Sequence, residues 1–414
     1  MNEASRTRRR VLKQCASLVA LASFPAMVRA QSDTVKLGHL ASRTGFLGQA
    51  GEQSYRGAQL AVDESNAAGG LLGRKLELIA EDSLNPATVT SKAQKMAERD
   101  RVVCLIGEVS SAAAVAIGEQ AARYKIPFFN TGANSDVLRG EKCNPYMFHV
   151  EGSNTMYTKT IGTWLKENNA IKNARFYFLT ADYPLGHDLH RVSSRFLQEN
   201  GGAAIANDVV PAGTSDYSAY LLKLRALKPD WVYLNLAGVD QTTFLKQYRE
   251  YNLPFALTGG TMDTVQFWGA GLENLLGHWQ SLWYHGLKVP AAQAFTKRFS
   301  GKHGMPPDNH AWSGYVGARI ALQAIAETKS TQAAKLIEHL ERGASFDLLK
   351  ERKGSFRKGD HQLLQEMYVV RVKEKPKSKD KWDIFDIVRS VPSSSESLET
   401  IQPTQAESSC KLPA

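Results

Sequence analysis

The chain has 414 residues, of which 43% are hydrophobic and 22% are charged, and its formal net charge is +10 at pH 7. This balance is typical of a globular protein and excludes a low-complexity chain. No apolar run has the roughly 20 residues that a membrane-spanning helix needs. The densest basic run, Lys373 to Lys381, also contains acids and a proline and lacks aromatic residues. It therefore indicates a solvated loop, and we do not expect nucleic-acid binding.

The first thirty residues have the pattern of an export signal. Residues 7–13 read T-R-R-R-V-L-K, which is the twin-arginine pattern, and a modestly apolar stretch follows up to Val28-Arg29-Ala30. We expect cleavage after Ala30 and a periplasmic product. The alternative, an N-terminal anchor helix, would need a longer apolar stretch. Cleavage would remove six basic residues and one acid, which lowers the formal charge from +10 to +5.

Three cysteines remain after residue 30, and their spacing matches no metal site. Cys104 lies in the apolar run V-V-C-L-I, which favours a buried free thiol. In an oxidising compartment, Cys143 and Cys410 could form a disulfide that ties the C-terminal tail to a loop. The alternative is three free thiols.

Short apolar runs alternate with amphipathic runs from residue 35 onward. In 111–124, for example, Ala114, Ile117, Ala121 and Tyr124 recur at helical spacing. The pattern predicts strands at 35–40, 76–79, 101–106 and 126–129, and helices at 52–66, 86–99 and 111–124. Strands that alternate with helices predict a parallel sheet covered on both faces.

The same alternation restarts after Asn154. Strands are predicted at 175–179, 204–210, 231–236 and just before Gly259, with helices at 188–198, 215–226, 240–251, 291–303 and 314–326 and a β-rich end at 356–388. The tail from Ser390 is rich in Ser, Thr, Pro and Glu, so we expect it to be poorly ordered or held only through Cys410. Two successive α/β units predict two lobes. Such sheets bind ligands beyond the carboxyl ends of their strands, so a ligand crevice is expected between the lobes.

A candidate anion site follows the strand that ends at residue 106. Ser110 and Ser111 stand at the start of an Ala-rich helix, where free N–H groups and the helix dipole favour a carboxylate. The alternative is that one serine only caps the helix. Residues 130–135 could form a second set of free amides, or an ordinary polar loop.

Further candidates lie in the second unit. Tyr183 and Leu185 follow a strand and could form an apolar wall over a ligand. Asp263 could pair with a ligand ammonium, because a cation taken out of water needs a counter-charge. The alternative for Asp263 is a helix N-cap.

Signatures of enzymes and cofactors are weak. Gly45, Gly48 and Gly51 lack the G-K-[ST] of a phosphate-binding loop, and no G-x-S-x-G motif occurs. His187 and His190 are three residues apart on a predicted helix, but no carboxylate or cysteine companion stands out, which favours surface histidines over metal ligands. We therefore expect no catalytic residues, cofactor or metal.

Seven stretches carry a family resemblance. They are T-G-F-L-G from Thr44, Y-R-G-A-Q-L-A-V-D-E-S-N-A-A-G-G-L-L-G-R from Tyr55, E-D-S-L-N-P, I-G-E-V-S-S, K-I-P-F-F-N-T, D-Y-P-L-G and K-P-D-W-V-Y. In this order and spacing, the chain resembles the periplasmic solute-binding proteins of branched-chain amino acid ABC transporters and their amide-sensing relatives. The resemblance covers nearly all of the chain after the signal.

The resemblance implies a type I periplasmic binding fold, in which two Rossmann-like lobes with parallel sheets are joined by three crossovers. Lobe 1 is then expected at 31–152 plus about 286–352, lobe 2 at 153–285 plus about 353–390, and a C-terminal tail at 391–414. A monomer that delivers its ligand to an inner-membrane ABC permease is implied. A ligand sensor without a transport role is the alternative, and an enzyme is a third.

The resemblance also implies roles for individual residues. The carboxylate-binding serine corresponds to Ser110 or Ser111, the following loop to Ala133 and Asn134, and the ammonium-binding acid falls between Thr261 and Asp263. Two departures matter. Leu185 stands where many members have an aromatic residue, and the acid aligns loosely. The ligand therefore stays open between an amino acid and another small carboxylate.

Overall fold

The computed structural model describes residues 34–404 and 406–412. The predicted twin-arginine signal and its cleavage after Ala30 lie outside these residues. In the part of the chain that is described, no helix is both long and apolar enough to cross a membrane.

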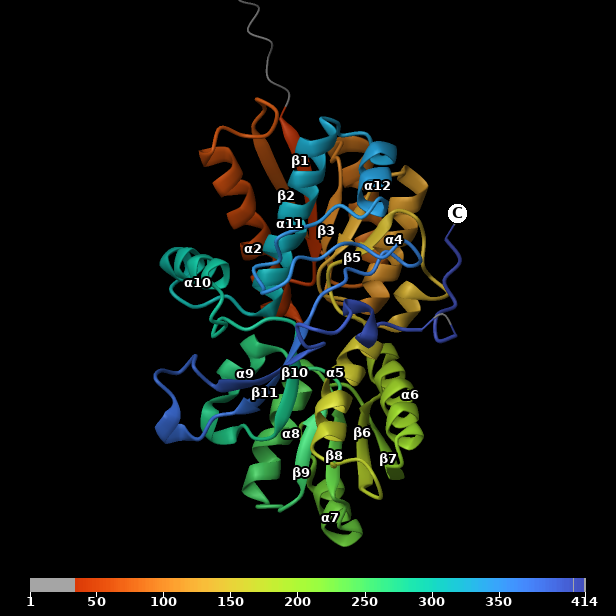
Figure 1. Ribbon diagram of the computed structural model, residues 1–414, viewed down its shortest axis with the longest axis vertical. Helices are drawn as coiled ribbons and strands as arrows, with labels where there is room; N and C mark the ends of the chain where they lie inside the picture. The colour runs from red at the N-terminus through yellow and green to blue at the C-terminus, as the bar shows by residue number, and fades with distance from the viewer. Residues whose placement is uncertain (1–33, 405, 413–414) are drawn as a thin grey trace, which may run out of the picture. The chain divides into compact units, whose positions relative to one another are not determined.

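The first sheet has five parallel strands in the order β2-β1-β3-β4-β5 (Figure 1). Their bounds are β1 Val35–Ala41, β2 Leu76–Asp82, β3 Leu105–Gly107, β4 Phe128–Asn130 and β5 Met147–His149. The sheet confirms the first predicted unit, but β3 begins four residues later than expected. The preceding helix ends in a π-helical turn, Met96–Asp100, and Arg101 has a φ of 56°, so the chain becomes extended only afterwards. The short strand β5 was not predicted.

Helices cover this sheet. They are α2 Gly48–Ala67, α3 Pro86–Lys95, α4 Ser111–Tyr124, α11 Asn309–Thr328 and α12 Ala333–Glu341. Helix α11, cyan in Figure 1, comes from much later in the chain and packs on α2. Two glycines permit this contact, because a Cβ on Gly57 would lie 1.9 Å from the Ala311 oxygen and one on Gly314 would lie 2.1 Å from the Ser54 oxygen. The return of the chain thereby completes the first lobe.

The second sheet has four parallel strands in the order β7-β6-β8-β9. They are β6 Arg175–Ala181, β7 Ala203–Val210, β8 Trp231–Asn235 and β9 Ala256–Gly259. The helices of this lobe are α5 Asn154–Glu167, α6 Pro184–Glu199, α7 Ser218–Leu227, α8 Gly238–Glu250 and α9 Thr264–Ala270. A separate antiparallel sheet contains β10 His278–Ser281, β11 Met367–Val372 and β12 Phe385–Val391.

The chain passes between the two lobes three times: after β5 into α5, after β10 into α10 (Pro290–His303) and α11, and after α12 into β11. This confirms the predicted fold class. The exact lobe boundaries stay a proposal. Gln362 forms a bridge with His149, and the His361 ring stacks on Phe148 with centroids 4.2 Å apart. These contacts favour a third crossing after residue 363 over one at 353.

The described residues of the C-terminal tail contact both lobes, so the expectation of a tail that is poorly ordered or held only through Cys410 is wrong. Strand β12 runs to Val391, and Ile401 is buried. Glu407 pairs with Lys159 at 2.9 Å and with Arg195 at 2.7 Å. Cys410 forms the predicted disulfide with Cys143, while Cys104 is a buried free thiol. Composition alone overlooked these ion pairs, which need partners distant in sequence.

Replacing Cys143 and Cys410 together with serine is expected to lower the free energy of unfolding by about 2–4 kcal/mol. The disulfide joins residues 267 positions apart and so restricts the unfolded chain. Urea unfolding followed by fluorescence measures the change. A reductant should reproduce it in the wild type and have no effect on the double variant. Equal stability of the oxidised wild type and the double variant would contradict this role.

Candidate functional site

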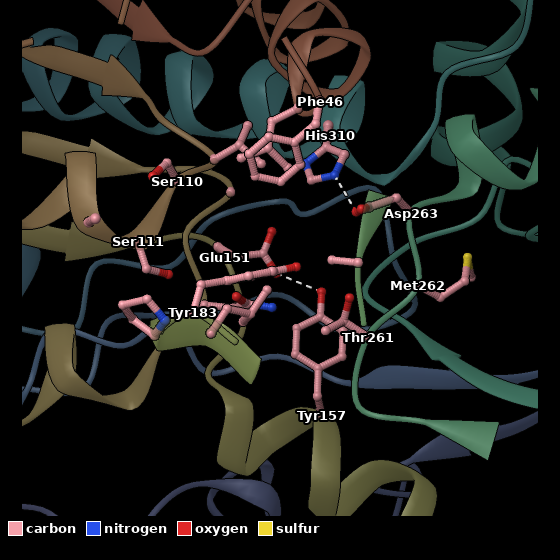
Figure 2. Close-up of a pocket in the computed structure, with 18 of the residues that line it drawn as sticks. Phe46, Ser110, Ser111, Glu151, Tyr157, Tyr183, Thr261, Met262, Asp263 and His310 are labelled. Carbon is pink, nitrogen blue, oxygen red and sulfur yellow. Dashed lines mark hydrogen bonds and ion pairs between the residues drawn. The ribbon is translucent and has the colours of Figure 1, made fainter. Parts of the chain in front are cut away.

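A cavity of about 240 Å³ lies between the lobes, beyond the carboxyl ends of strands from both sheets (Figure 2). It is lined by loops after β1, β4, β6 and β9, by the start of α4, by the first crossing and α5, and by the start of α11. The lining residues used below are Phe46, Leu47, Val109–Ala112, Asn134, Glu151, Tyr157, Tyr183–Leu185, Met262, Asp263 and His310. This is the crevice predicted from the paired α/β units.

Six of the seven predicted site residues line this cavity: Ser110, Ser111, Asn134, Tyr183, Leu185 and Asp263. Ala133 does not line it and is fully buried. The amides of Gly132 and Ala133 donate to the Asn130 Oδ1 at 3.3 and 2.9 Å. These two amides therefore stabilise the loop itself, which fits the alternative of an ordinary polar loop.

The start of α4 presents hydrogen-bond donors to the cavity. The Ser110 Oγ caps the helix by accepting from the Ala113 amide at 3.4 Å, and the Ser111 Oγ accepts from the Ser135 amide at 3.3 Å. Each hydroxyl acts as an acceptor there, so its proton stays available for a ligand. Within the described residues, the amides of Ser111 and Ala112 have no acceptor. Together with the helix dipole, these groups suit a carboxylate.

Glu108 leaves fewer backbone amides free to bind a ligand than the sequence suggested. It is fully buried, and its Oε1 accepts from the amides of Val109 at 2.9 Å and Ser110 at 2.8 Å. Burial raises the pKa of Glu108, and the hydrogen bonds that this carboxyl accepts oppose the effect. Nothing in the local sequence indicated this role.

His310 and Asp263 form an ion pair in the cavity wall, with the His310 Nε2 2.8 Å from the Asp263 Oδ1. Burial opposes a charge on His310. The hydrogen bond to Asp263 and the charges of Asp263, Asp308 and Glu151 outweigh it and raise the His310 pKa to about 9. Asp263 occupies the N-cap position of α9, but its side chain makes no capping hydrogen bond. Sequence reasoning missed His310, since a lone histidine near a helix start gives no signal.

Glu151 and Tyr157 form a second polar pair that the sequence did not reveal. The Tyr157 hydroxyl donates to the Glu151 Oε1 at 2.6 Å, and the Gly152 amide donates to the same oxygen at 3.0 Å. The Glu151 Oε2 is buried and has no partner among the described residues. Burial raises the pKa of Glu151, and the charge of His310 and the hydrogen bond from Tyr157 oppose this effect.

Apolar side chains form the rest of the wall, among them Leu47, Val109, Leu185 and Met262. At the mouth, Phe46 from the first lobe faces Tyr183 from the second, with ring centroids 6.3 Å apart. Phe46 is 54% exposed. This ring contact joins the two lobes directly beside the cavity.

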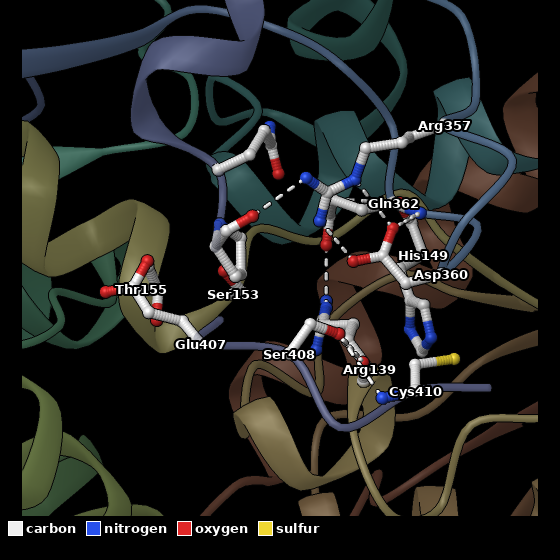
Figure 3. Close-up of polar contacts among 12 residues, drawn as sticks. Arg139, His149, Ser153, Thr155, Arg357, Asp360, Gln362, Glu407, Ser408 and Cys410 are labelled. Carbon is white, nitrogen blue, oxygen red and sulfur yellow. Dashed lines mark hydrogen bonds and ion pairs between the residues drawn. The ribbon is translucent and has the colours of Figure 1, made fainter. Parts of the chain in front are cut away.

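Arg139 holds the loops behind the cavity. Its buried guanidinium donates to the carbonyls of residues 133, 135, 151 and 152, and its Nε donates to the Gln362 Oε1 at 2.6 Å (Figure 3). Burial lowers the Arg139 pKa to about 10, which still leaves it charged at neutral pH. One side chain thus joins the first crossing, the loop that carries Asn134 and the segment at Gln362 just before the third crossing.

The polar groups of the cavity suit binding and orientation of a solute. In the described residues, no group of three or more His, Cys, Asp or Glu side chains could hold a metal ion. His187 is an exposed partner of Asp182 at 2.9 Å, and His190 packs against Phe178 with ring centroids 4.8 Å apart.

The imidazole of His310 is expected to titrate near pH 9 instead of near 6.5. Because its folded-state pKa is raised, its stabilising effect is complete below about pH 6.5 and is lost as the pH rises through 9. The change is on the order of 3 kcal/mol. Histidine ring NMR signals, assigned with His310→Gln, measure the midpoint. A midpoint at or below 6.5 would contradict the charged pair.

Several known proteins are similar to this chain. Leu/Ile/Val-binding protein homolog 7 of Brucella suis is 26% identical over 351 residues, which cover 78% of this chain and 84% of the Brucella protein. The structure of a branched-chain amino acid ABC transporter periplasmic ligand-binding protein of Burkholderia xenovorans matches with a TM-score of 0.80 and 26% identity. The match covers 91% of this chain and 99% of the Burkholderia chain. An ABC transporter solute-binding protein of R. palustris, solved with benzoate, matches with a TM-score of 0.75 and 22% identity. The match covers 86% of this chain and 96% of the R. palustris chain, and at this identity it shows only that the fold is shared.

A family model described as periplasmic binding protein matches residues 34–380, which is most of the chain. The two parallel sheets, the three crossings and the cavity between the lobes agree with this match. The chain belongs to the periplasmic binding protein family.

Proposed function

We propose that this protein is the periplasmic solute-binding component of an ABC importer. It captures a small carboxylate between its lobes and delivers it, chemically unchanged, to the permease. The observation that carries this proposal is the set of free donors at the start of α4: two hydroxyls and two amides that open into a cavity between two lobes. These donors match the two oxygens of a carboxylate.

Binding and closure are coupled in this proposal. A ligand held by Ser110 and Ser111 on the first lobe also touches Tyr183 and Leu185 on the second, so it binds the closed state more tightly than the open state. The contact between Phe46 and Tyr183 adds a direct contact between the lobes in the closed state. The permease would recognise the closed form of the monomer.

Similar proteins support this ligand class. The names of the Brucella and Burkholderia proteins refer to leucine, isoleucine and valine or to branched-chain amino acids, and the R. palustris protein was solved with benzoate. All of these molecules carry a carboxylate and an apolar body. The cavity offers both a donor cluster and an apolar wall.

Changing Ser110 and Ser111 together to alanine is expected to weaken ligand binding by about 1–3 kcal/mol, because the carboxylate would lose hydrogen bonds in a desolvated site. Isothermal titration calorimetry with benzoate and with leucine measures the loss for whichever ligand binds. Unchanged affinity would contradict the assigned role.

Two controls separate binding from folding. Ser110 caps α4, so its loss also costs about 1 kcal/mol of stability, whereas Ser111→Ala leaves that cap intact. Ser91→Ala removes an exposed helical hydroxyl far from the cavity and should change nothing. A loss of affinity in Ser111→Ala, with thermal stability near that of Ser91→Ala, would assign the effect to the ligand.

A further inference from the structure

Asp263, the acid expected to bind a ligand ammonium, already has a cationic partner within the protein, His310. His310 lies 2.8 Å from the Asp263 Oδ1, and both residues are in the cavity wall. The His310 side chain is only 4% exposed and that of Asp263 12%, so water does little to screen the pair. The pair carries no net charge, and an incoming ammonium would meet an imidazolium beside the carboxylate.

The other acid of the cavity does not replace Asp263. Both Tyr157 and Gly152 donate to the Glu151 Oε1, and the Glu151 Oε2 is buried without a partner in the described chain. Burial raises the pKa of this carboxyl. Because one of its oxygens is taken by two donors and the other is buried, Glu151 presents no free oxygen to an ammonium in the cavity.

Asp308, the third acid near His310, is also unsuited to bind an ammonium. Its Oδ1 caps α11 by accepting from the Ala311 amide at 2.7 Å, and it does not line the cavity. The acidic groups that face His310 are thus Asp263, Asp308 and Glu151. Asp263 pairs with His310, Asp308 caps α11, and one oxygen of Glu151 accepts from Tyr157 and Gly152.

We propose that His310 is a specificity-determining residue: by pairing with Asp263 it removes the ammonium subsite, so the cavity selects a monocarboxylate with an apolar body and no α-ammonium. This inference rests on the proposed function and narrows its ligand class. The carboxylate binds at the start of α4, and the apolar body lies against Leu185 and Met262. An α-amino acid is excluded by charge, whatever the shape of its side chain.

Matched ligand pairs test this directly. L-leucine and 4-methylpentanoate differ only by the α-ammonium, as do L-phenylalanine and 3-phenylpropanoate, and benzoate serves as a fifth ligand. Calorimetry on the full exported protein, unfolded and refolded beforehand to remove bound solute, should show at least tenfold tighter binding of the acid that lacks the ammonium in at least one pair.

The variant His310→Gln tests whether the preference for acids without an ammonium depends on the charge of the imidazolium. In His310→Gln, the amide can still donate to Asp263 but carries no charge, so the ratio of affinities should move at least tenfold toward the amino acid. His339→Gln is the matched control. It breaks a histidine–carboxylate pair, with Glu327 at 2.8 Å, outside the cavity and should leave the ratio unchanged.

The outcomes distinguish the two proposals. If any of the five ligands binds but in neither pair the acid without the ammonium binds at least tenfold more tightly than the amino acid, the role of His310 is overturned and the proposed function stands. If the ratio stays the same in a folded His310→Gln, the role is also overturned. If His310→Gln fails to fold, the ratios in the wild type alone decide. If none of the five ligands binds, both proposals are contradicted.

Discussion

The structure depends on one buried cation at the seam between its lobes. Arg139 is 2% exposed, and its guanidinium donates to the backbone of both the 133–135 loop and the first crossing. It also donates to Gln362, just before the third crossing. Carbonyl oxygens share the positive charge, so desolvation is offset by charge-assisted hydrogen bonds. Asn134 and Glu151, which line the cavity, lie on the segments that this one side chain holds.

Buried polar groups recur along the crossings and the cavity. Lys350 donates to the Gln365 side chain at 2.8 Å and to the Glu366 carbonyl at 2.7 Å, and burial lowers its pKa to about 7. The pKa of His310 is shifted in the other direction, because pairing with Asp263 favours the charged imidazolium. Such networks fix one geometry because every misplacement would leave a polar group without a partner. The contacts of Arg139 and the pair of His310 with Asp263 thereby hold the walls of the cavity in place.

Local patterns predicted the fold well. The alternation of strands and helices, and even the bounds 111–124 of α4, agree with the structure because amphipathic spacing is a property of short segments. The site was recovered only in part. Ser110, Ser111 and Asp263 follow strands and were found by position, but His310, Glu151, Glu108 and Arg139 were missed. Their roles depend on partners far away in sequence, such as Asp263 for His310 and Gln362 for Arg139, and no local pattern encodes such pairs.

The central claim is that the cavity holds one small carboxylate at the start of α4. Native mass spectrometry of the protein purified without denaturation tests it most directly, because the mass of a co-purifying molecule gives its composition. The account predicts one bound acid per chain, with a carboxylate and an apolar body, that is lost in the Ser110 and Ser111 double variant. A bound molecule without a carboxylate, or one equally retained by that variant, would contradict the account.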